Sequence, residues 1–199
     1  MSTAEKRHYT VEEYLEFERT SGTKHEYYQG EIFAMVGASP AHNRIVWNLS
    51  RFLGNQLDGT PCEGFANDMR VKVERTGLYT YPDVAIACGE AKFEKQVIHS
   101  LLNPTSIIEV LSNSTANYDR VEKFAQYQTI DSFQQYVLVS QKEYHVEVFT
   151  KQSDGQWPSS SFRGLDAKIE LGVIGCTLAL SDVYRRVEIP EREESPSNG

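Results

Sequence analysis

The chain has few cysteines, no long apolar run and no excess of positive charge, and each shortage argues against a class of protein. Three cysteines, Cys62, Cys88 and Cys176, lie far apart and form no CxxC pair. This spacing argues against a structural zinc site and a disulfide framework, and it favours a reducing compartment. The apolar runs are a handful of residues long, far below the roughly 20 needed to span a bilayer. We therefore expect no membrane association.

The N-terminal segment and the net charge limit where the chain acts and what it binds. The segment MSTAEKRHYTVEEY has no apolar region of the kind found in a secretory signal. Together with the cysteine spacing, this predicts a cytoplasmic location. The net charge of −8 disfavours nucleic acid as a partner, because phosphate contacts depend on Lys and Arg. The distribution of charge matters more than its sum, so a nucleic-acid partner remains open.

Length and composition indicate one globular domain. The chain has 199 residues, of which 40% are hydrophobic and 24% are charged, as in ordinary globular proteins. We predict a single α/β domain over residues 1–189, with a central mixed β-sheet flanked by helices. The last ten residues, PEREESPSNG, are polar and contain proline, and they predict a disordered tail over 190–199.

Helix and strand signals define the elements of this domain. Thr10 and Glu13 form a capping-box pattern at the start of a first helix, and HEYYQGEI predicts a hairpin. Ser39-Pro40 predicts the N-cap and first residue of a second helix. Further strands are expected over 69–74, 78–87, 105–112, 135–140 and 143–151. A helix over 118–129 would join two of these strands as a right-handed parallel crossover.

Two acids stand inside segments that otherwise belong to a core. Asp83 follows Pro82 and precedes Val-Ala-Ile-Ala, and Glu109 lies within Ser-Ile-Ile-Glu-Val-Leu. A buried carboxylate needs a compensating cation or several hydrogen-bond donors. A hard divalent cation is one such partner, and it requires a strand register that puts both acids on one face. Backbone amides for Asp83, and a covering Lys or Arg for Glu109, are the alternative partners.

The order of the motifs resembles a known family. YTVEEYLEF, HEYYQGEI, SPAHNRI, YPDVAI, IIEVLSNST, YDRVEKFAQYQTI and QYVLVS occur in this order over roughly residues 9–186. This series resembles a widespread bacterial restriction endonuclease family, formerly a domain of unknown function, in the PD-(D/E)XK nuclease superfamily. The resemblance implies a restriction endonuclease-like core with an N-terminal helix and hairpin. It also implies Mg²⁺ (or Mn²⁺) bound by Asp83 and Glu109 and used to hydrolyse DNA.

The sequence departs from the superfamily pattern at one position. The motif calls for a lysine two residues after the second acid, and this chain has Leu111 there. Lys123 matches a lysine position of the family and is the candidate replacement. A regular helix would put Val121 and Phe124 on its apolar face and Lys123 at the flank of that face. Lys123 is thus either a catalytic lysine that reaches the sheet or a solvated one.

Secondary site candidates lie in the hairpin and at the start of the second helix. His42 falls near the first turn of that helix, where it would contact phosphate or metal, or act only as a capping or surface residue. Glu31 matches a family position and is a candidate third acid, although a surface glutamate on a strand is the alternative. Glu26 is likewise either a third acid near the metal or a surface glutamate.

Two functions remain open at the level of sequence. The first is a Mg²⁺-dependent endonuclease acting on DNA. Nucleases that cut both strands often need two sites, so a homodimer is an open alternative, with the apolar hairpin as a candidate contact. The second is a catalytically impaired member of the same fold that serves as a binding or assembly module, which Leu111 and the acidic charge favour. A glycosidase-like pair of acids is a third hypothesis, but aromatic residues are lacking around both acids.

Overall fold

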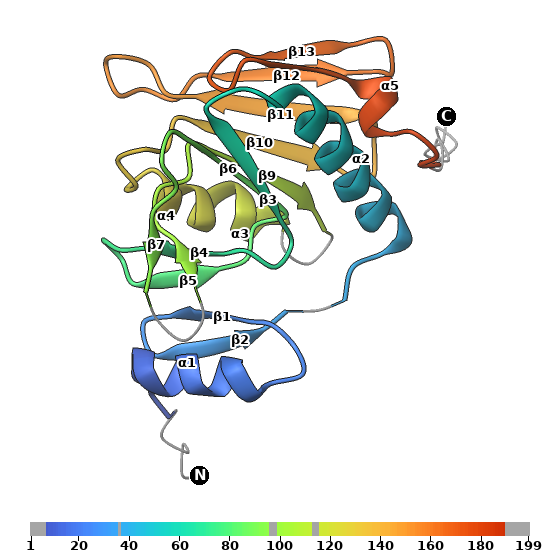
Figure 1. The fold of residues 1–199 in the computed structure, drawn as a ribbon. Helices are drawn as coiled ribbons and strands as arrows, with labels where there is room; N and C mark the ends of the chain where they lie inside the picture. Colours follow the sequence, from blue (N-terminus) through green and yellow to red (C-terminus); the bar gives the residue numbers. More distant parts are fainter. Residues whose placement is uncertain (1–6, 36, 96–98, 113–115, 190–199) are drawn as a thin grey trace, which may run out of the picture.

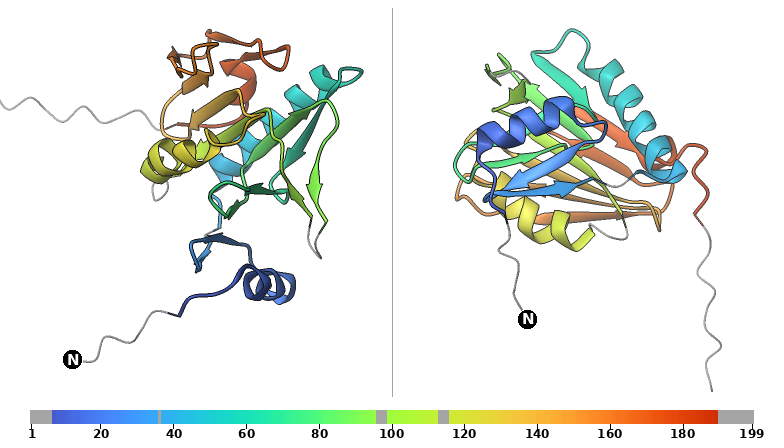
Figure 2. Two further views of the ribbon diagram at one scale, coloured as in Figure 1. Left: turned by 90° about the vertical axis from the view of Figure 1, so that its left-hand side faces the viewer. Right: turned by 90° about the horizontal axis from the view of Figure 1, so that it is seen from below.

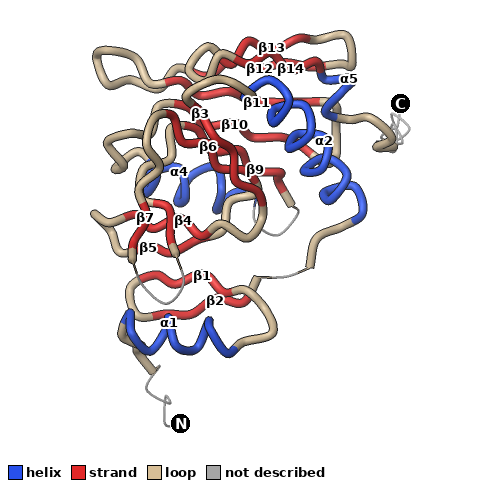
Figure 3. The backbone as a smooth tube through the Cα atoms, in the orientation of Figure 1, coloured by secondary structure: helices blue, strands red, loops and turns tan. Residues whose placement is uncertain are grey.

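The structure is a computed structural model, and it describes residues 7–35, 37–95, 99–112 and 116–189. The tail predicted over 190–199 lies outside the described residues. The described strands form two larger sheets and a two-stranded one (Figures 1 and 3). None of the helices in the described ranges has both the length and the apolar character needed to cross a bilayer.

An N-terminal helix and hairpin form a layer at one end of the molecule (Figure 2). Helix α1 (Val11–Thr20) begins with the predicted capping box, in which Thr10 and Glu13 exchange hydrogen bonds. The hairpin of β1 (His25–Tyr28) and β2 (Glu31–Ala34) turns at Gln29-Gly30, as predicted, with both residues at positive φ. Tyr14 of α1 stacks on Tyr27 of β1, with ring centroids 4.9 Å apart. This contact fixes the helix to the hairpin.

The hairpin is one edge of the first sheet. The remaining strands of this sheet are β4 (Arg70–Val73), β5 (Leu78–Thr80), β7 (Phe93–Glu94) and β8 (Ser100–Leu101). The strand order is β2-β1-β5-β4-β8-β7. β1 joins β5 through the pair Tyr27 and Tyr79, so the N-terminal layer is hydrogen-bonded to the rest of the fold.

The second sheet is mixed and holds the core. Its strands are β3 (Cys62–Ala66), β6 (Val84–Cys88), β9 (Ser106–Leu111), β10 (Gln135–Ser140), β11 (His145–Thr150) and β12 (Ser159–Arg163). The strand order is β12-β11-β10-β9-β6-β3, and β9 and β10 run parallel, as the predicted crossover requires. The central strands β6, β9 and β10 are almost entirely buried, which agrees with a sheet covered on both faces.

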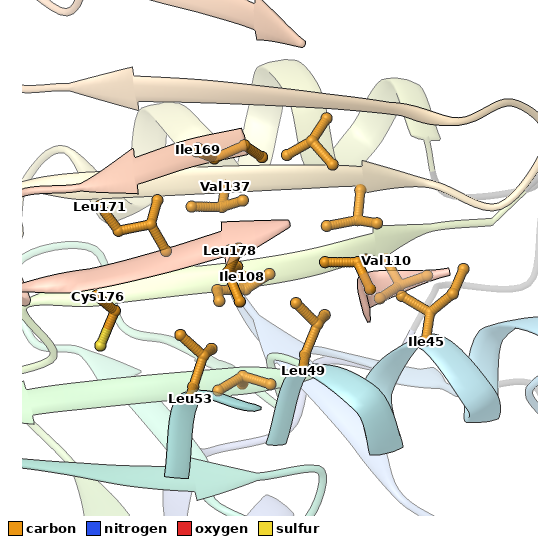
Figure 4. Packing of buried hydrophobic residues seen from close by; sticks show 14 of the residues in the cluster. Ile45, Leu49, Leu53, Ile108, Val110, Val137, Ile169, Leu171, Cys176 and Leu178 are labelled. Atoms are coloured by element: carbon orange, nitrogen blue, oxygen red, sulfur yellow. The ribbon is translucent and has the colours of Figure 1, made fainter. Parts of the chain in front are cut away.

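Helix α2 (Pro40–Leu57) covers one face of the second sheet. It starts as predicted, with Ser39 accepting a hydrogen bond from the His42 amide and Pro40 in the first turn. Figure 4 shows the inner face of α2 packed against the sheet through residues of its apolar stripe, with the two-stranded sheet β13 (Lys168–Leu171) and β14 (Cys176–Ala179) completing the cluster. The final helix is α5 (Leu180–Val183).

The opposite face is covered by the helical segment between β9 and β10, and here the predicted phase is wrong. The segment consists of α3 (Ala116–Tyr118), a π-helical turn η1 (Asp119–Lys123) and α4 (Phe124–Tyr127). A regular helix would bury Val121, but its exposed fraction is 56%, whereas Lys123 and Tyr127 are buried. The wider π turn shifts every side chain in this turn relative to a 3.6-residue period.

The segment predicted as one strand over 78–87 is two strands in different sheets. β5 ends at Thr80 and β6 begins at Val84, with Pro82 and Asp83 between them. Proline lacks an amide hydrogen for a strand ladder, so a break at this position is expected. Asp83 consequently lies where the chain leaves the first sheet and enters the second.

The expectation of no disulfide is wrong. β3 and β6 are antiparallel neighbours whose register pairs Cys62 with Cys88, and the two sulfurs are bonded, with 3.9 Å between the Cα atoms. The residues are 26 positions apart in sequence, so spacing alone does not reveal that they are cross-strand neighbours. The disulfide also removes the cysteine-based argument for a reducing compartment.

Candidate active site

The register of β6 and β9 brings Asp83 and Glu109 together. Val84 pairs with Ile108 in this antiparallel ladder, so Asp83, one residue before β6, lies opposite Glu109. The Asp83 amide donates a hydrogen bond of 3.3 Å to Glu109 Oε2, and the Val110 amide donates one of 2.7 Å to Asp83 Oδ2. The two acids predicted from sequence therefore share one face at the end of the ladder.

Lys123 lies at the centre of the cluster. Its Nζ atom is 3.0 Å from Glu109 Oε1, 3.1 Å from Asp119 Oδ1 and 3.2 Å from Glu26 Oε1. The π turn directs Lys123 and Asp119 to the same side, where both are buried. Lys123 therefore reaches the sheet and is not a solvated lysine.

Glu26 joins the site from the N-terminal hairpin. Its carboxylate also accepts a hydrogen bond from the hydroxyl of Thr80, at the end of β5. Glu109 in turn accepts a hydrogen bond of 3.1 Å from the Tyr127 hydroxyl of α4. The site is therefore assembled from both larger sheets and from the helical segment between β9 and β10.

His42 contacts Asp83 from the first turn of α2. The distance from His42 Nε2 to Asp83 Oδ2 is 3.2 Å, and the two side chains are 14% and 16% exposed. The other ring nitrogen, Nδ1, is buried and has no hydrogen-bond partner among the described residues. His42 thus belongs to the site and is not a surface residue.

The remaining sequence candidates lie around this cluster. Glu31 pairs across the hairpin with Tyr28, and Phe33 pairs with Glu26, so Glu31 and Glu26 are on the same face at different positions along it. Leu111 packs at the edge of the apolar cluster on the α3–α4 side. The structure therefore assigns the lysine of this site to the helical segment and not to β9.

A second buried network, which the sequence patterns do not predict, supports the Asp83 segment. Glu18 Oε1 accepts hydrogen bonds from the His25 amide at 3.0 Å and from the Tyr81 hydroxyl at 2.8 Å, and Glu18 Oε2 lies 3.0 Å from His25 Nδ1. Tyr81 is two residues before Asp83, so this network fixes the chain that enters the site. The one feature of the sequence that could have indicated this network is Glu18, an acid in line with the apolar stripe of α1.

Burial and charge shift the proton affinities of the central groups in the same direction. Burial raises the pKa of Glu109 to about 8; Lys123 opposes this rise, and the carboxylates of Asp119 and Asp83 add to it. Burial alone would lower the pKa of Lys123, but Glu109 and Glu26 hold it well above its ordinary value. Lys123 therefore stays an ammonium group, and a bound cation would favour the ionised form of Glu109.

The donor set suits a hard divalent cation that also binds substrate and water. Among the described residues, no group of three or more His, Cys, Asp and Glu side chains has the arrangement to hold an ion alone. Mg²⁺ commonly takes one or two protein carboxylates and fills its shell with water and phosphate oxygens. Asp83 and Glu109 provide two adjacent carboxylates, of which Asp83 is 16% exposed and Glu109 is buried. Asp83 Oδ1 makes no hydrogen bond within the described part of the chain.

Comparisons with known proteins give the relatives of this chain. It is 36% identical over 174 residues to the uncharacterized protein slr1290 of Synechocystis sp., covering 87% of this chain and 90% of the relative. It is 39% identical over 161 residues to the uncharacterized protein sll1609 of the same organism, covering 81% and 91%. Neither relative's description assigns an activity.

A solved structure shares the fold. The crystal structure of a putative nuclease of the DUF820 group from Anabaena variabilis superimposes with a TM-score of 0.71, over 88% of this chain and 97% of that one, at 17% identity. The chain thus has the mixed α/β, restriction endonuclease-like fold that the motif order implied. Residues 11–181 match the Uma2 family, described as putative restriction endonuclease. The chain belongs to this family.

Proposed function

We propose that this protein is a divalent-metal-dependent endonuclease that hydrolyses phosphodiester bonds of DNA. The observation that carries the proposal is the placement of Asp83 and Glu109 opposite each other, with the Lys123 ammonium group 3.0 Å from Glu109. Two carboxylates and one lysine on adjacent elements are the groups that this chemistry needs. Membership in the Uma2 family supports the same reaction class.

Asp83 and Glu109 would hold Mg²⁺ or Mn²⁺. Bound there, the ion would polarise a phosphodiester oxygen and lower the pKa of a bound water. The hydrogen bond from the Val110 amide fixes one oxygen of Asp83, so its other oxygen points in a defined direction. His42 of α2 contacts the same carboxylate of Asp83, and this contact limits the rotation of the carboxylate.

Lys123 would orient the attacking water and stabilise negative charge on the phosphoryl oxygens. Preorganised charge of this kind is effective because Lys123 is already buried and held in place before negative charge develops. Glu26 and Asp119 keep the ammonium group in place. Through these contacts the helical segment provides the lysine that β9 lacks at Leu111, which also weakens the case for an impaired binding module.

The remaining expectations are part of the same proposal. Residues 1–189 act as one domain, Glu31 and His42 are secondary site residues, and the protein acts on DNA in the cytoplasm. A homodimer through the hairpin would present two sites to the two strands of a duplex. Edge strand β2 carries Phe33, which is 45% exposed, and it is the surface available for this contact.

Plasmid cleavage in Mg²⁺ or Mn²⁺ tests the proposal. Asp83→Asn keeps an oxygen that accepts the Val110 amide but removes the charge, and it should lower the rate by about 100-fold or more. Lys123→Ala should lower the rate by about 10²–10³-fold. Lys72→Ala is the matched control, because Lys72 pairs with Glu94 in the first sheet and outside the site.

The outcomes separate the two functions. Metal-dependent cleavage that is lost in Asp83→Asn and Lys123→Ala but kept in Lys72→Ala supports the endonuclease. Equal cleavage by wild type and Lys123→Ala would refute the role of this lysine. An absence of metal-dependent cleavage by folded wild-type protein would leave the binding module as the better function.

A further inference from the structure

Helix α2 differs in charge from the rest of this acidic chain. The chain contains 28 Asp and Glu residues among 199 and has a net charge of −8. The 18 residues of α2, PAHNRIVWNLSRFLGNQL, contain none of these acids and two arginines. A continuous surface without carboxylates is where an acidic protein can accept an anionic partner.

The outer face of α2 presents an aromatic ring between two guanidinium groups. Arg44, Trp47 and Arg51 lie at positions i, i+3 and i+7, which places them on one side of a helix. Trp47 is 72% exposed, and both arginines are exposed. Neither arginine forms an ion pair with a described residue; the Arg51 guanidinium lies 5.4 Å from the ring of Phe52. The opposite side of the helix is anchored in the core (Figure 4).

The N-terminal turn of α2 lies beside the candidate active site, and the outer face lies on the other side of the helix, because Arg44, Trp47 and Arg51 follow His42 by about 140–200° around the helix axis. His42, in the first turn of α2, contacts Asp83, and Arg44 is two residues further along. At 1.5 Å per residue, Arg51 lies about 14 Å beyond His42 along the helix axis. In Figure 1, α2 runs along the outside of the molecule from the end where the chain arrives from the hairpin. A strand on this face therefore reaches Asp83 by crossing the N-terminal end of α2, about half a turn around the helix from Arg44.

We infer that the outer face of α2 binds an unpaired strand of nucleic acid that flanks the cleavage position. Trp47 stacks on one base, and Arg44 and Arg51 contact the phosphates on either side. The inference rests on the proposed nuclease function and extends it to the form of the substrate. Aromatic stacking combined with basic side chains along a backbone is the general mode of binding single strands.

The charges on this face favour an anionic partner over a second copy of the chain. In a twofold contact centred on Trp47, each copy would bring Arg44 and Arg51 against the same arginines of the other copy. Like charges facing each other oppose association. A phosphate backbone instead neutralises both arginines, and an unpaired base covers the exposed indole.

Binding of labelled oligonucleotides in EDTA tests the inference without cleavage. Fluorescence anisotropy compares a single-stranded 20-mer with its duplex, for wild type, Trp47→Ala, Trp47→Phe and Arg44→Ala/Arg51→Ala. We expect tighter binding of the single strand, and an affinity loss of about 5- to 100-fold in Trp47→Ala that Trp47→Phe largely restores. The double arginine variant should reduce the slope of log affinity against log salt by about 1.4.

A charge-matched control and a cleavage assay make the outcomes distinct. Arg75→Ala/Lys168→Ala removes two exposed positive charges elsewhere and should leave the affinity within about twofold. Three results would overturn the inference: equal affinity of Trp47→Ala and wild type for the single strand, tighter binding of the duplex than of the single strand, or equal losses of affinity in the two double variants. Dissociation of a dimer by Trp47→Ala, with oligonucleotide binding unchanged, would assign the face to a second copy. If these binding results overturn the role of the α2 face but Asp83-dependent plasmid cleavage is observed, the proposed endonuclease function stands. If wild type neither binds the oligonucleotides nor cleaves the plasmid, both the inference and the proposed function are rejected.

Discussion

Lys123 is surrounded by carboxylates from three parts of the chain, and each contact has a different origin. Asp119 is its neighbour within the π turn, Glu109 belongs to β9, and Glu26 belongs to the hairpin. A buried charge is costly without its partners, so the ammonium group and the surrounding carboxylates compensate one another. Removing the lysine leaves three buried acids without their cation.

At the scale of this residue, Lys123→Met should destabilise the metal-free protein by about 3–5 kcal/mol, because the uncompensated carboxylates are buried. Urea unfolding followed by circular dichroism measures the change. Saturating Mg²⁺ should recover part of the loss, since the ion binds the folded site. Lys72→Met, which breaks the less deeply buried pair with Glu94, should cost less, about 1–2 kcal/mol. A loss below 1 kcal/mol in Lys123→Met would contradict the account.

At the scale of the element, the π turn η1 decides which side chains of the helical segment reach the site. Val121→Ser tests which side chains the turn directs to the core and which to solvent. Because Val121 is 56% exposed, this change should alter the free energy of unfolding by no more than about 0.5 kcal/mol. Phe133→Ala, at a fully buried position nearby, should cost about 3–5 kcal/mol. A loss of 2 kcal/mol or more in Val121→Ser would indicate a regular helix with Val121 in the core.

The disulfide between β3 and β6 makes a separate prediction. Cys62→Ser/Cys88→Ser should lower the free energy of unfolding by about 3 kcal/mol, because the bond closes a loop of 26 residues. Thiol titration of the denatured, unreduced protein should find one free thiol, that of Cys176. Three free thiols in freshly purified protein would show that the bond does not form.

These elements also show which features a sequence can predict. The capping box at Thr10, the hairpin turn at Gln29-Gly30 and the start of α2 depend on local chemistry, and all three were predicted. Asp83 and Glu109 stood out because acids rarely occur in buried strands. The π turn, the break before β6 and the Cys62–Cys88 bond depend on long-range packing and register, which local periodicity does not contain.

At the scale of the whole molecule, the excess of acid in the site makes the stability depend on pH. The pKa of Glu109 is about 8 in the folded protein against an ordinary value of 4.5. A raised folded-state pKa means that the folded protein binds the proton more tightly than the unfolded chain. Its stabilising effect is therefore present below about pH 4.5 and is lost as the pH rises through about 8.

The expected result is a melting temperature that falls between about pH 5 and 8.5 in EDTA. Differential scanning calorimetry measures the slope, and Glu109→Gln should flatten it, because the titrating group is gone. Mg²⁺ should flatten it as well by favouring the ionised carboxylate. A wild-type slope that Glu109→Gln leaves unchanged would assign the dependence to other groups.

The central claim is that Asp83 and Glu109 bind a divalent cation, and calorimetric titration with Mn²⁺ tests it most directly. The account predicts that wild type binds the ion and that Asp83→Asn binds it at least about 10-fold more weakly, while both unfold at similar urea concentrations. The Lys72→Ala control should bind Mn²⁺ like wild type. Equal Mn²⁺ binding by wild type and Asp83→Asn, or no binding by folded wild type, would contradict the account.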